Sequence, residues 1–215
     1  MNYKNSYNKD YYENGLIKGI SGYQNYRWIP ELTIPMAYHL IQNLPISNNQ
    51  RILDYGCAKG YLVKALRLLG FDAYGVDVSE YAIDNVDSDI RKFCSLIKKT
   101  SKKNLLYQGY DWMIAKDVFE HIPENELSDL LKSINNIHKI FVAIPLADDD
   151  VTGKYIIPEY DKDITHVIAK THLWWKAFFE NNGWKISFFD FKFHGIKENW
   201  TEISEKGNGF YILSK

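Results

Sequence analysis

A run of small residues between an expected strand and an expected helix is the part of this sequence best suited to hold a ligand. The run has the pattern Asp54-x-Gly56-x-Ala58-x-Gly60, and its Asp54 ends an expected strand that begins at Arg51. Glycine and alanine let backbone N–H groups approach a ligand closely, and the following helix directs the positive end of its dipole at the same point. In an open α/β sheet, ligands bind in this crevice at the carboxyl ends of the strands.

The spacing of the run excludes two common nucleotide-binding motifs. Tyr61 stands where a dinucleotide fingerprint has its third glycine, and the Gly-Lys-Ser or Gly-Lys-Thr of a P-loop is absent. A second acidic residue, Asp77, ends the next expected strand, where a carboxylate can accept hydrogen bonds from both hydroxyls of a ribose. The alternative explanation of Asp77 is an acidic residue at the start of a helix, where the helix dipole favours it.

The run 54–60 resembles motif I of the class I S-adenosylmethionine-dependent methyltransferases, in which a glycine usually stands at the position of Ala58. Two later segments match the same family in order and spacing: 114–123, with its Glu-His-Ile, and 141–145, which corresponds to the fifth strand. The resemblance implies a methyltransferase whose cofactor is S-adenosyl-L-methionine. The cofactor-binding residues that it implies are Asp54, Gly56, Cys57, Ala58, Gly60, Asp77, Val78 and Asp117.

The N-terminal segment, up to about residue 29, is rich in tyrosine, asparagine and glycine. Its aromatic residues and one arginine could fold over the site, bind the cofactor carboxylate or stack on a sugar. Tyr23 and Arg27 are therefore further candidates for cofactor contacts. The alternative is a simple aromatic cover on the core, and this explanation is favoured for Trp28.

Methyl transfer to a hydroxyl requires a base that removes the hydroxyl proton, and an imidazole suits that task because its intrinsic pKa is near neutral. His166 lies on the long polar loop after the fifth expected strand, and His121 lies beside the cofactor end of the fourth. A structural role is the alternative for both histidines. Asp148, in the acidic run 148–150, is a third catalytic candidate. That run could also bind Mg²⁺, but it is more typical of a solvated loop, so we expect no metal site.

The segment 163–184 contains Thr-His-Val, two adjacent tryptophans and Asn-Gly-Trp. In this it resembles methyltransferases of bacterial surface-polysaccharide gene clusters, which implies a small-molecule acceptor, a hydroxyl of a sugar or sugar nucleotide. Four alternatives stay open: N-methylation of a small amine or amino sugar, methylation of a quinone-type ring, RNA methylation, and a non-catalytic cofactor-binding protein. A near-neutral charge and the lack of an appended RNA-binding module argue against RNA.

The composition limits the class of protein and its partners. The chain has 215 residues, 46% of them hydrophobic, which fits one globular domain with a sizeable core. Lys+Arg total 26 and Asp+Glu 27, for a net charge of -1, so nothing electrostatic favours duplex nucleic acid as a partner. Two cysteines exclude a disulfide-stapled scaffold. Without an apolar run of membrane-spanning length or a signal peptide, we expect a cytoplasmic protein.

Strand and helix patterns alternate along the chain, which predicts an α/β fold. We expect a Rossmann-like, seven-stranded, mostly parallel sheet with helices on both faces and the last strand antiparallel. Pro30 and Pro35 are expected to bracket a turn and a helix start. One methyltransferase domain should span 1–215, divided into an N-terminal aromatic cover and helix (1–45), a cofactor-binding half (46–146), and an acceptor loop with edge strands (147–215).

Overall fold

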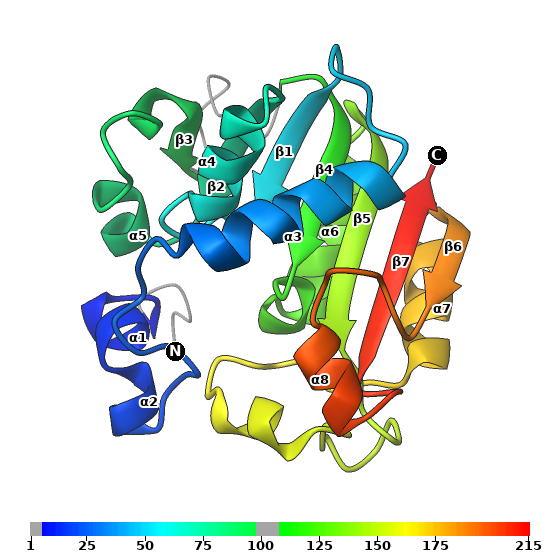
Figure 1. Cartoon of the computed structure of the whole chain (residues 1–215). Coiled ribbons are helices and arrows are strands. Elements are labelled where there is room, and N and C mark those ends of the chain that lie inside the picture. Colours follow the sequence, from blue (N-terminus) through cyan, green and yellow to red (C-terminus); the bar gives the residue numbers. More distant parts are fainter. Residues whose placement is uncertain (1–5, 98–107) are drawn as a thin grey trace.

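The chain is represented by a computed structural model, which describes residues 6–97 and 108–215. Its strands form one sheet of seven in the order β3-β2-β1-β4-β5-β7-β6 (Figure 1). All neighbouring pairs from β3 to β5 are parallel, whereas β7 runs antiparallel to both β5 and β6. The strands are β1 (Arg51–Tyr55), β2 (Asp72–Asp77), β3 (Cys94–Leu96), β4 (Tyr110–Lys116), β5 (Ile137–Pro145), β6 (Lys185–Asp190) and β7 (Asn208–Ser214). The expected sheet, with its antiparallel last strand, is confirmed.

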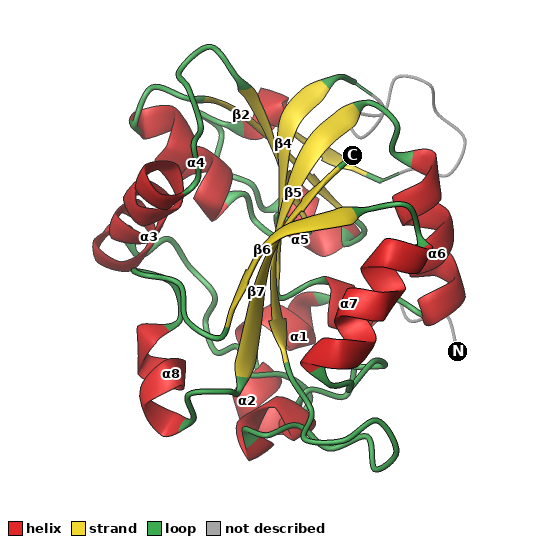
Figure 2. Ribbon diagram, turned by 90° about the vertical axis from the view of Figure 1, so that its right-hand side faces the viewer, coloured by secondary structure: helices red, strands yellow, loops and turns green. Residues whose placement is uncertain are grey.

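Helices cover both faces of this sheet. Figure 2 shows α3 (Pro30–Asn43) and α4 (Tyr61–Leu68) on one side, with α6 (Glu124–Ser133) and α7 (His172–Asn181) on the other. The remaining helices are short: α1 (Lys9–Glu13), α2 (Gly15–Lys18), α5 (Glu80–Asp84), α8 (Glu198–Ile203) and the 3₁₀ turns η2 (Arg91–Phe93), η4 (Phe119–His121) and η5 (Pro158–Lys162). Side-chain caps begin three of the described helices, α1, α5 and α7. Asn8 accepts a hydrogen bond from the N–H of Asp10, Ser79 from that of Ala82, and Thr171 from that of Trp174.

The core consists of two apolar layers, one on each face of the sheet. Successive residues of a strand point to opposite faces. In β4, Trp112 and Ile114 join the layer beneath α3 and α4, and Met113 and Ala115 join the layer beneath α6 and α7. Because helices cover both faces, the central strands are apolar throughout rather than alternating. This rigid sheet places the ends of β1, β2 and β4 along one edge.

Three details of the secondary structure differ from the sequence-based expectation. Pro30 is the first residue of α3 and Pro35 lies inside it, so no turn separates the two prolines. The bond that Pro35 cannot make would go to the carbonyl of the exposed residue Glu31, which water can satisfy. The N-terminal segment, which has weak periodicity, contains α1 and α2. Helix α8 lies between the two final strands, although these strands still pair as expected.

The polar run 98–104 lies within the residues that the structure leaves out. Among the residues described, no helix combines the length and apolar character that crossing a membrane requires.

Candidate active site

The turn after β1 depends on residues that tolerate a left-handed backbone. Gly56 and Gly60 have φ of 81° and 76°, and a Cβ on Gly56 would lie 2.5 Å from Val118 Cγ2. A Cβ on Gly60 would lie 2.8 Å from Cys94 Sγ. Ala58 has a φ of 48°, so an L-residue stands in the region that favours glycine. The turn is therefore held in a conformation that places backbone close to the ends of β2 and β4.

Asp77 ties this turn to the end of β2. Its carboxylate accepts hydrogen bonds from the N–H groups of Ala58, at 2.8 Å, and Ser79, at 2.7 Å. Burial raises the pKa of Asp77, while the N–H groups of Ser79, Ala58 and Val78 favour the charged form. A carboxylate has about four lone-pair positions. With three N–H groups on the carboxylate, one position remains for a ligand in the pocket that Asp77 lines.

That pocket spans the carboxyl ends of four strands. Its floor comes from the segments after β1, β2, β3 and β4, and its cover comes from the N-terminal tyrosines. The lining residues are Tyr7, Tyr11, Tyr12, Tyr23, Tyr55, Gly56, Ala58, Asp77, Val78, Ile97, Asp117, Val118, His121, Ile122, Glu126 and Leu130. One part of the lining is apolar, with Val78, Ile97 and Leu130, and another part carries carboxylates and an imidazole. The pocket can therefore accept a molecule with a flat apolar end and a polar end.

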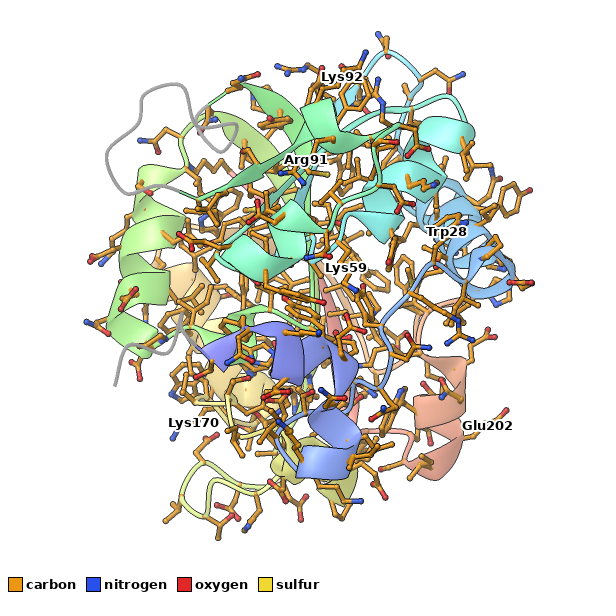
Figure 3. All side chains as sticks on the ribbon, turned by 90° about the vertical axis from the view of Figure 1, so that its left-hand side faces the viewer. Trp28, Lys59, Arg91, Lys92, Lys170 and Glu202 are labelled. Carbon is orange, nitrogen blue, oxygen red and sulfur yellow. The ribbon has the colours of Figure 1, made fainter. Side chains whose placement is uncertain are left out.

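The N-terminal helices close the pocket through specific polar contacts. The Glu13 carboxylate lies 2.6 Å from Lys59 Nζ and accepts a hydrogen bond from the Tyr81 hydroxyl at 2.9 Å. Lys59 lies where the N-terminal helices meet the rest of the chain (Figure 3). On the other side, the Tyr11 hydroxyl donates to Asp163 Oδ2 at 2.8 Å. The cover is thus fastened to both the cofactor-side turn and the loop after β5.

Asp117, which follows β4, is held by two ammonium groups. Its backbone φ is 55°, and the residue lines the pocket. Each of its carboxylate oxygens pairs with the ammonium group of a lysine. Lys116 Nζ lies 2.6 Å from Oδ2, and Lys197 Nζ donates to Oδ1. Although burial acts to raise it, the two ammonium groups hold the pKa of Asp117 well below its usual range. The side chain therefore carries a negative charge that is already matched within the protein.

His121 and His166 lie side by side although 45 positions separate them in the sequence. Their ring centroids are 4.5 Å apart. Two backbone hydrogen bonds hold the segment that carries His166 next to His121. The carbonyl of Glu120 accepts them from the N–H groups of Val167 and Ile168 at 2.9 and 3.0 Å. The loop after β5 thus lies against His121, which lines the pocket.

Hydrogen bonding defines which ring nitrogens of the two histidines carry hydrogen. His166 Nδ1 lies 2.8 Å from the carbonyl oxygen of Tyr160, which can only accept, so Nδ1 donates. The Thr165 hydroxyl donates to Asp163 Oδ1 at 2.5 Å and therefore accepts from His121 Nδ1 at 2.8 Å. In the neutral rings both Nε2 atoms consequently carry a lone pair.

The surroundings keep both rings neutral. Burial, followed by the influence of His166, lowers the pKa of His121 to about 4, and burial also lowers the pKa of His166. A neutral imidazole with Nδ1 hydrogen-bonded can accept a proton or bind a cation through Nε2.

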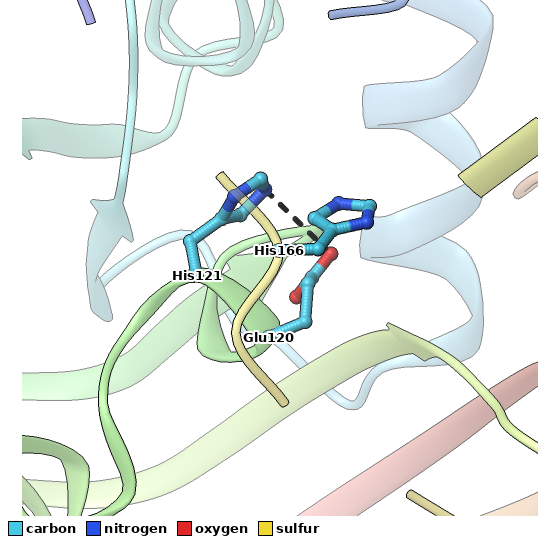
Figure 4. A group of neighbouring side chains, drawn as sticks. All are labelled: Glu120, His121 and His166. Atoms are coloured by element: carbon cyan, nitrogen blue, oxygen red, sulfur yellow. Dashed lines mark ion pairs between the residues drawn. The ribbon is translucent and has the colours of Figure 1, made fainter. Parts of the chain in front are cut away.

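Glu120 completes this group with a carboxylate that is fully buried (Figure 4). Neither of its side-chain oxygens has a hydrogen-bond partner among the residues that the structure describes. Oε1 lies 3.9 Å from His121 Nε2. Burial, then the charge of Asp117, raises the pKa of Glu120 well above its ordinary value. Glu120 was not a candidate from the sequence, although it belongs to the Glu-His-Ile motif. Its position next to His121 was the signal that could have pointed to it.

The structure places the remaining candidates as follows. The pocket lining includes Gly56, Ala58, Asp77, Val78, Asp117 and Tyr23 from the expected cofactor contacts. Asp54, Cys57 and Gly60 belong to the same turn but do not line the pocket, and Arg27 is exposed outside it. Asp148 is also exposed and away from the two histidines, on a loop in which Asp149 accepts from the N–H groups of Val151 and Thr152.

Sequence reasoning did not select several residues that the structure brings to the site. Tyr7, Tyr11 and Tyr12 line the pocket, and the tyrosine-rich N-terminus was a signal for them. Lys197 had no such signal, because it reaches Asp117 from 80 positions away.

Comparison with protein families identifies the class of protein. The model of a methyltransferase domain matches residues 31–198, which is more than half of the chain, and the chain therefore belongs to the methyltransferase-domain family. Its cofactor is S-adenosylmethionine, and the protein is a class I methyltransferase enzyme. No curated protein matches the chain as a sequence relative.

Solved structures show the same fold at low sequence identity. A methyltransferase from Archaeoglobus fulgidus that depends on S-adenosylmethionine is 19% identical, with a TM-score of 0.55 over 83% of this chain and 92% of that one. The CcbJ methyltransferase from Streptomyces caelestis is 11% identical, with a TM-score of 0.61 over 87% and 90%. Mitomycin 7-O-methyltransferase MmcR is 12% identical, with a TM-score of 0.59 over 85% of this chain and 54% of that chain, about half its length.

The pocket fits this cofactor. The apolar slot beside Val78 and Ile97 suits a flat adenine, and the Asp77 carboxylate beside it has a lone pair available for a ribose hydroxyl. In the turn next to Asp77, neighbouring atoms leave no room for a side chain at position 56 or 60, so both positions require glycine. The donor set and the shape thus agree with S-adenosylmethionine.

Proposed function

We propose that this enzyme methylates a hydroxyl of a small-molecule acceptor, a sugar or sugar nucleotide used in surface-polysaccharide synthesis in the cytoplasm. One observation carries the proposal: His121, which lines the pocket, and His166 beside it have neutral rings with a lone pair on each Nε2. A hydroxyl acceptor needs such a group for its proton, whereas an amine that arrives neutral does not.

The cofactor-side residues have separate tasks in this proposal. Asp77 accepts a hydrogen bond from a ribose hydroxyl while its other lone pairs keep the turn in place. Val78 contributes to the adenine slot. Asp54 braces the turn or reaches the cofactor amine through water. Gly56, Cys57, Ala58 and Gly60 form the turn itself, and we retain Asp117 and Tyr23 as lining contacts.

The protein contributes position and proton removal to the reaction. S-adenosylmethionine supplies an electron-poor methyl group when it is bound, and orientation then contributes much of the rate. His166 Nε2 takes the hydroxyl proton, with His121 Nε2 as the neighbouring alternative. The bound cofactor would supply the methyl group to the acceptor oxygen, and the electron pair of the carbon–sulfur bond would stay on sulfur. Asp148 and Arg27 have no part in this scheme because both are exposed outside the pocket.

The walls of the pocket support a sugar as the acceptor. Tyr7, Tyr11, Tyr12 and Tyr23 line it, and aromatic rings offer apolar faces with polar rims that suit sugar rings. Mitomycin 7-O-methyltransferase, with the same fold, is by its name an enzyme that methylates oxygen. A net charge of -1 does not favour binding of duplex nucleic acid.

A methylation assay over a panel of sugar nucleotides, free sugars and small amines tests the proposal. We expect a methyl ether on a sugar hydroxyl as the product. His166→Ala should lower kcat by about 10²–10⁴-fold, with cofactor affinity retained in calorimetry. His138→Ala is the matched control, since His138 lies exposed on β5. Methylation of amines alone, or near-full turnover in both His166→Ala and His121→Ala, would contradict the proposal.

A further inference from the structure

We propose that Glu120, His121 and His166 form a binding site for a divalent transition-metal cation at the wall of the pocket. This departs from the expectation of no metal. The assignment of the site stands on its geometry alone, whereas the role of the ion in methyl transfer rests on the proposed function.

The three side chains are arranged around a common point. One potential ligand atom from each lies within 4.8 Å of the others, and His121 Nε2 is 3.9 Å from Glu120 Oε1. Two ligands of one ion at bond lengths near 2.1 Å lie roughly 3 Å apart. A movement of about 1 Å at the ends of these side chains would therefore close the site around an ion.

The hydrogen bonds behind the histidines are those expected of metal ligands. A ligating histidine usually donates its other ring N–H to a carbonyl, carboxylate or similar acceptor, which fixes the ring. His166 Nδ1 meets the Tyr160 carbonyl, and His121 Nδ1 meets the Thr165 hydroxyl, which in turn donates to Asp163. Both Nε2 atoms are thereby left for a cation, and neither ring has to turn over to bind one.

Glu120 provides an independent reason for a cation at this point. It is fully buried, and neither oxygen has a hydrogen-bond partner among the described residues. A buried carboxylate without partners is costly, and a bound cation would satisfy it. The nearby ammonium groups of Lys116 and Lys197 already pair with Asp117, so they do not satisfy Glu120.

The donor set indicates which ions fit. Two imidazole nitrogens and one carboxylate oxygen suit Mn²⁺, Fe²⁺, Co²⁺ or Zn²⁺, whereas Mg²⁺ and Ca²⁺ prefer oxygen ligands only. Three protein ligands leave coordination positions open toward the pocket that His121 lines. An acceptor hydroxyl held there would have its pKa lowered, and its proton would leave to solvent water instead of to an imidazole.

Metal binding to the chelator-treated full-length protein tests the site. Mn²⁺ binding is measured by calorimetry and electron paramagnetic resonance, and Co²⁺ binding by visible absorption. We expect one ion per chain. Glu120→Gln and His166→Ala should each weaken binding by about 10–100-fold or more, and His138→Ala should leave it unchanged. Glu120→Gln keeps the shape of the side chain and removes only its charge. Loss of metal binding in this variant would therefore not be explained by a failure to fold.

The site is refuted if neither ion binds, or if both variants, checked for folding by circular dichroism, bind Mn²⁺ as the wild type does. The same protein samples are assayed for sugar methylation and for cofactor affinity. Hydroxyl methylation without metal binding overturns the metal site and leaves the proposed function intact. Site-specific metal binding without methylation of any hydroxyl supports the site and overturns the proposed function.

Discussion

Replacing Asp54 by asparagine removes a charge that the folded protein buries at the end of β1. Burial, followed by the nearby charge of Asp77, raises the pKa of Asp54 from 3.8 to about 7, although Lys116 opposes the shift. Between these two values the folded protein binds more protons than the unfolded chain. The free energy of unfolding therefore falls as the pH rises through this window.

The size of the effect follows from the shift. One pKa unit corresponds to about 1.4 kcal/mol, so the ionised Asp54 carboxylate destabilises the fold by about 4 kcal/mol at pH 8. At pH 5 only about 1–2 kcal/mol of this cost is present, because the folded state is still protonated. Asp54→Asn removes the cost, and the variant should be more stable than the wild type by a margin that grows from pH 5 to pH 8.

Urea denaturation without cofactor measures this difference at both pH values. Asp129→Asn is the matched control, since Asp129 is exposed on α6 and its replacement should change little. An asparagine variant that is no more stable than the wild type at pH 8, or a margin that does not grow with pH, would refute the reasoning. Calorimetry adds a functional readout: if Asp54 serves the cofactor amine, the more stable variant should also bind S-adenosylmethionine more weakly.

Two further substitutions test other parts of the site. Asp77→Ala should weaken cofactor binding by roughly 10–100-fold, because it removes a charged acceptor worth about 1.5–3 kcal/mol, and unchanged affinity in calorimetry would reject that contact. Lys197→Met should lower the free energy of unfolding by about 1–3 kcal/mol, since it leaves the half-buried charge of Asp117 with one partner. Lys192→Met, at an exposed ion pair with Glu205, should change it by less than about 0.5 kcal/mol. Equal effects of the two lysine substitutions in denaturation would contradict the role of Lys197.

Local patterns predicted the sheet and the turn because both depend on short-range rules. The short apolar runs of the strands, the glycines at 56 and 60, and the caps at Ser79 and Thr171 are all visible within a few residues. Pro35 misled the prediction for the opposite reason. A proline normally ends or kinks a helix, but α3 is long enough and exposed enough on that side to contain it.

The histidine side of the candidate site was harder to predict because it depends on contacts between distant segments. His121 and His166 were both candidates, yet nothing in the sequence showed that their rings lie 4.5 Å apart. That proximity results from two backbone hydrogen bonds to the Glu120 carbonyl. The ion pair between Lys197 and Asp117 likewise depends on the path of the chain after β6, which no local pattern encodes.

Asp163 connects the cover of the pocket to His121, which lines the pocket. One carboxylate oxygen accepts from the Tyr11 hydroxyl, and the other accepts from the Thr165 hydroxyl and N–H. Because the Thr165 hydroxyl gives its hydrogen to Asp163, it must accept from His121 Nδ1, which leaves Nε2 free. Docking of the N-terminal helices and the tautomer of His121 therefore depend on the same carboxylate. One anchor of the N-terminal cover and the position of the proton on His121 are thus set by the same group of hydrogen bonds.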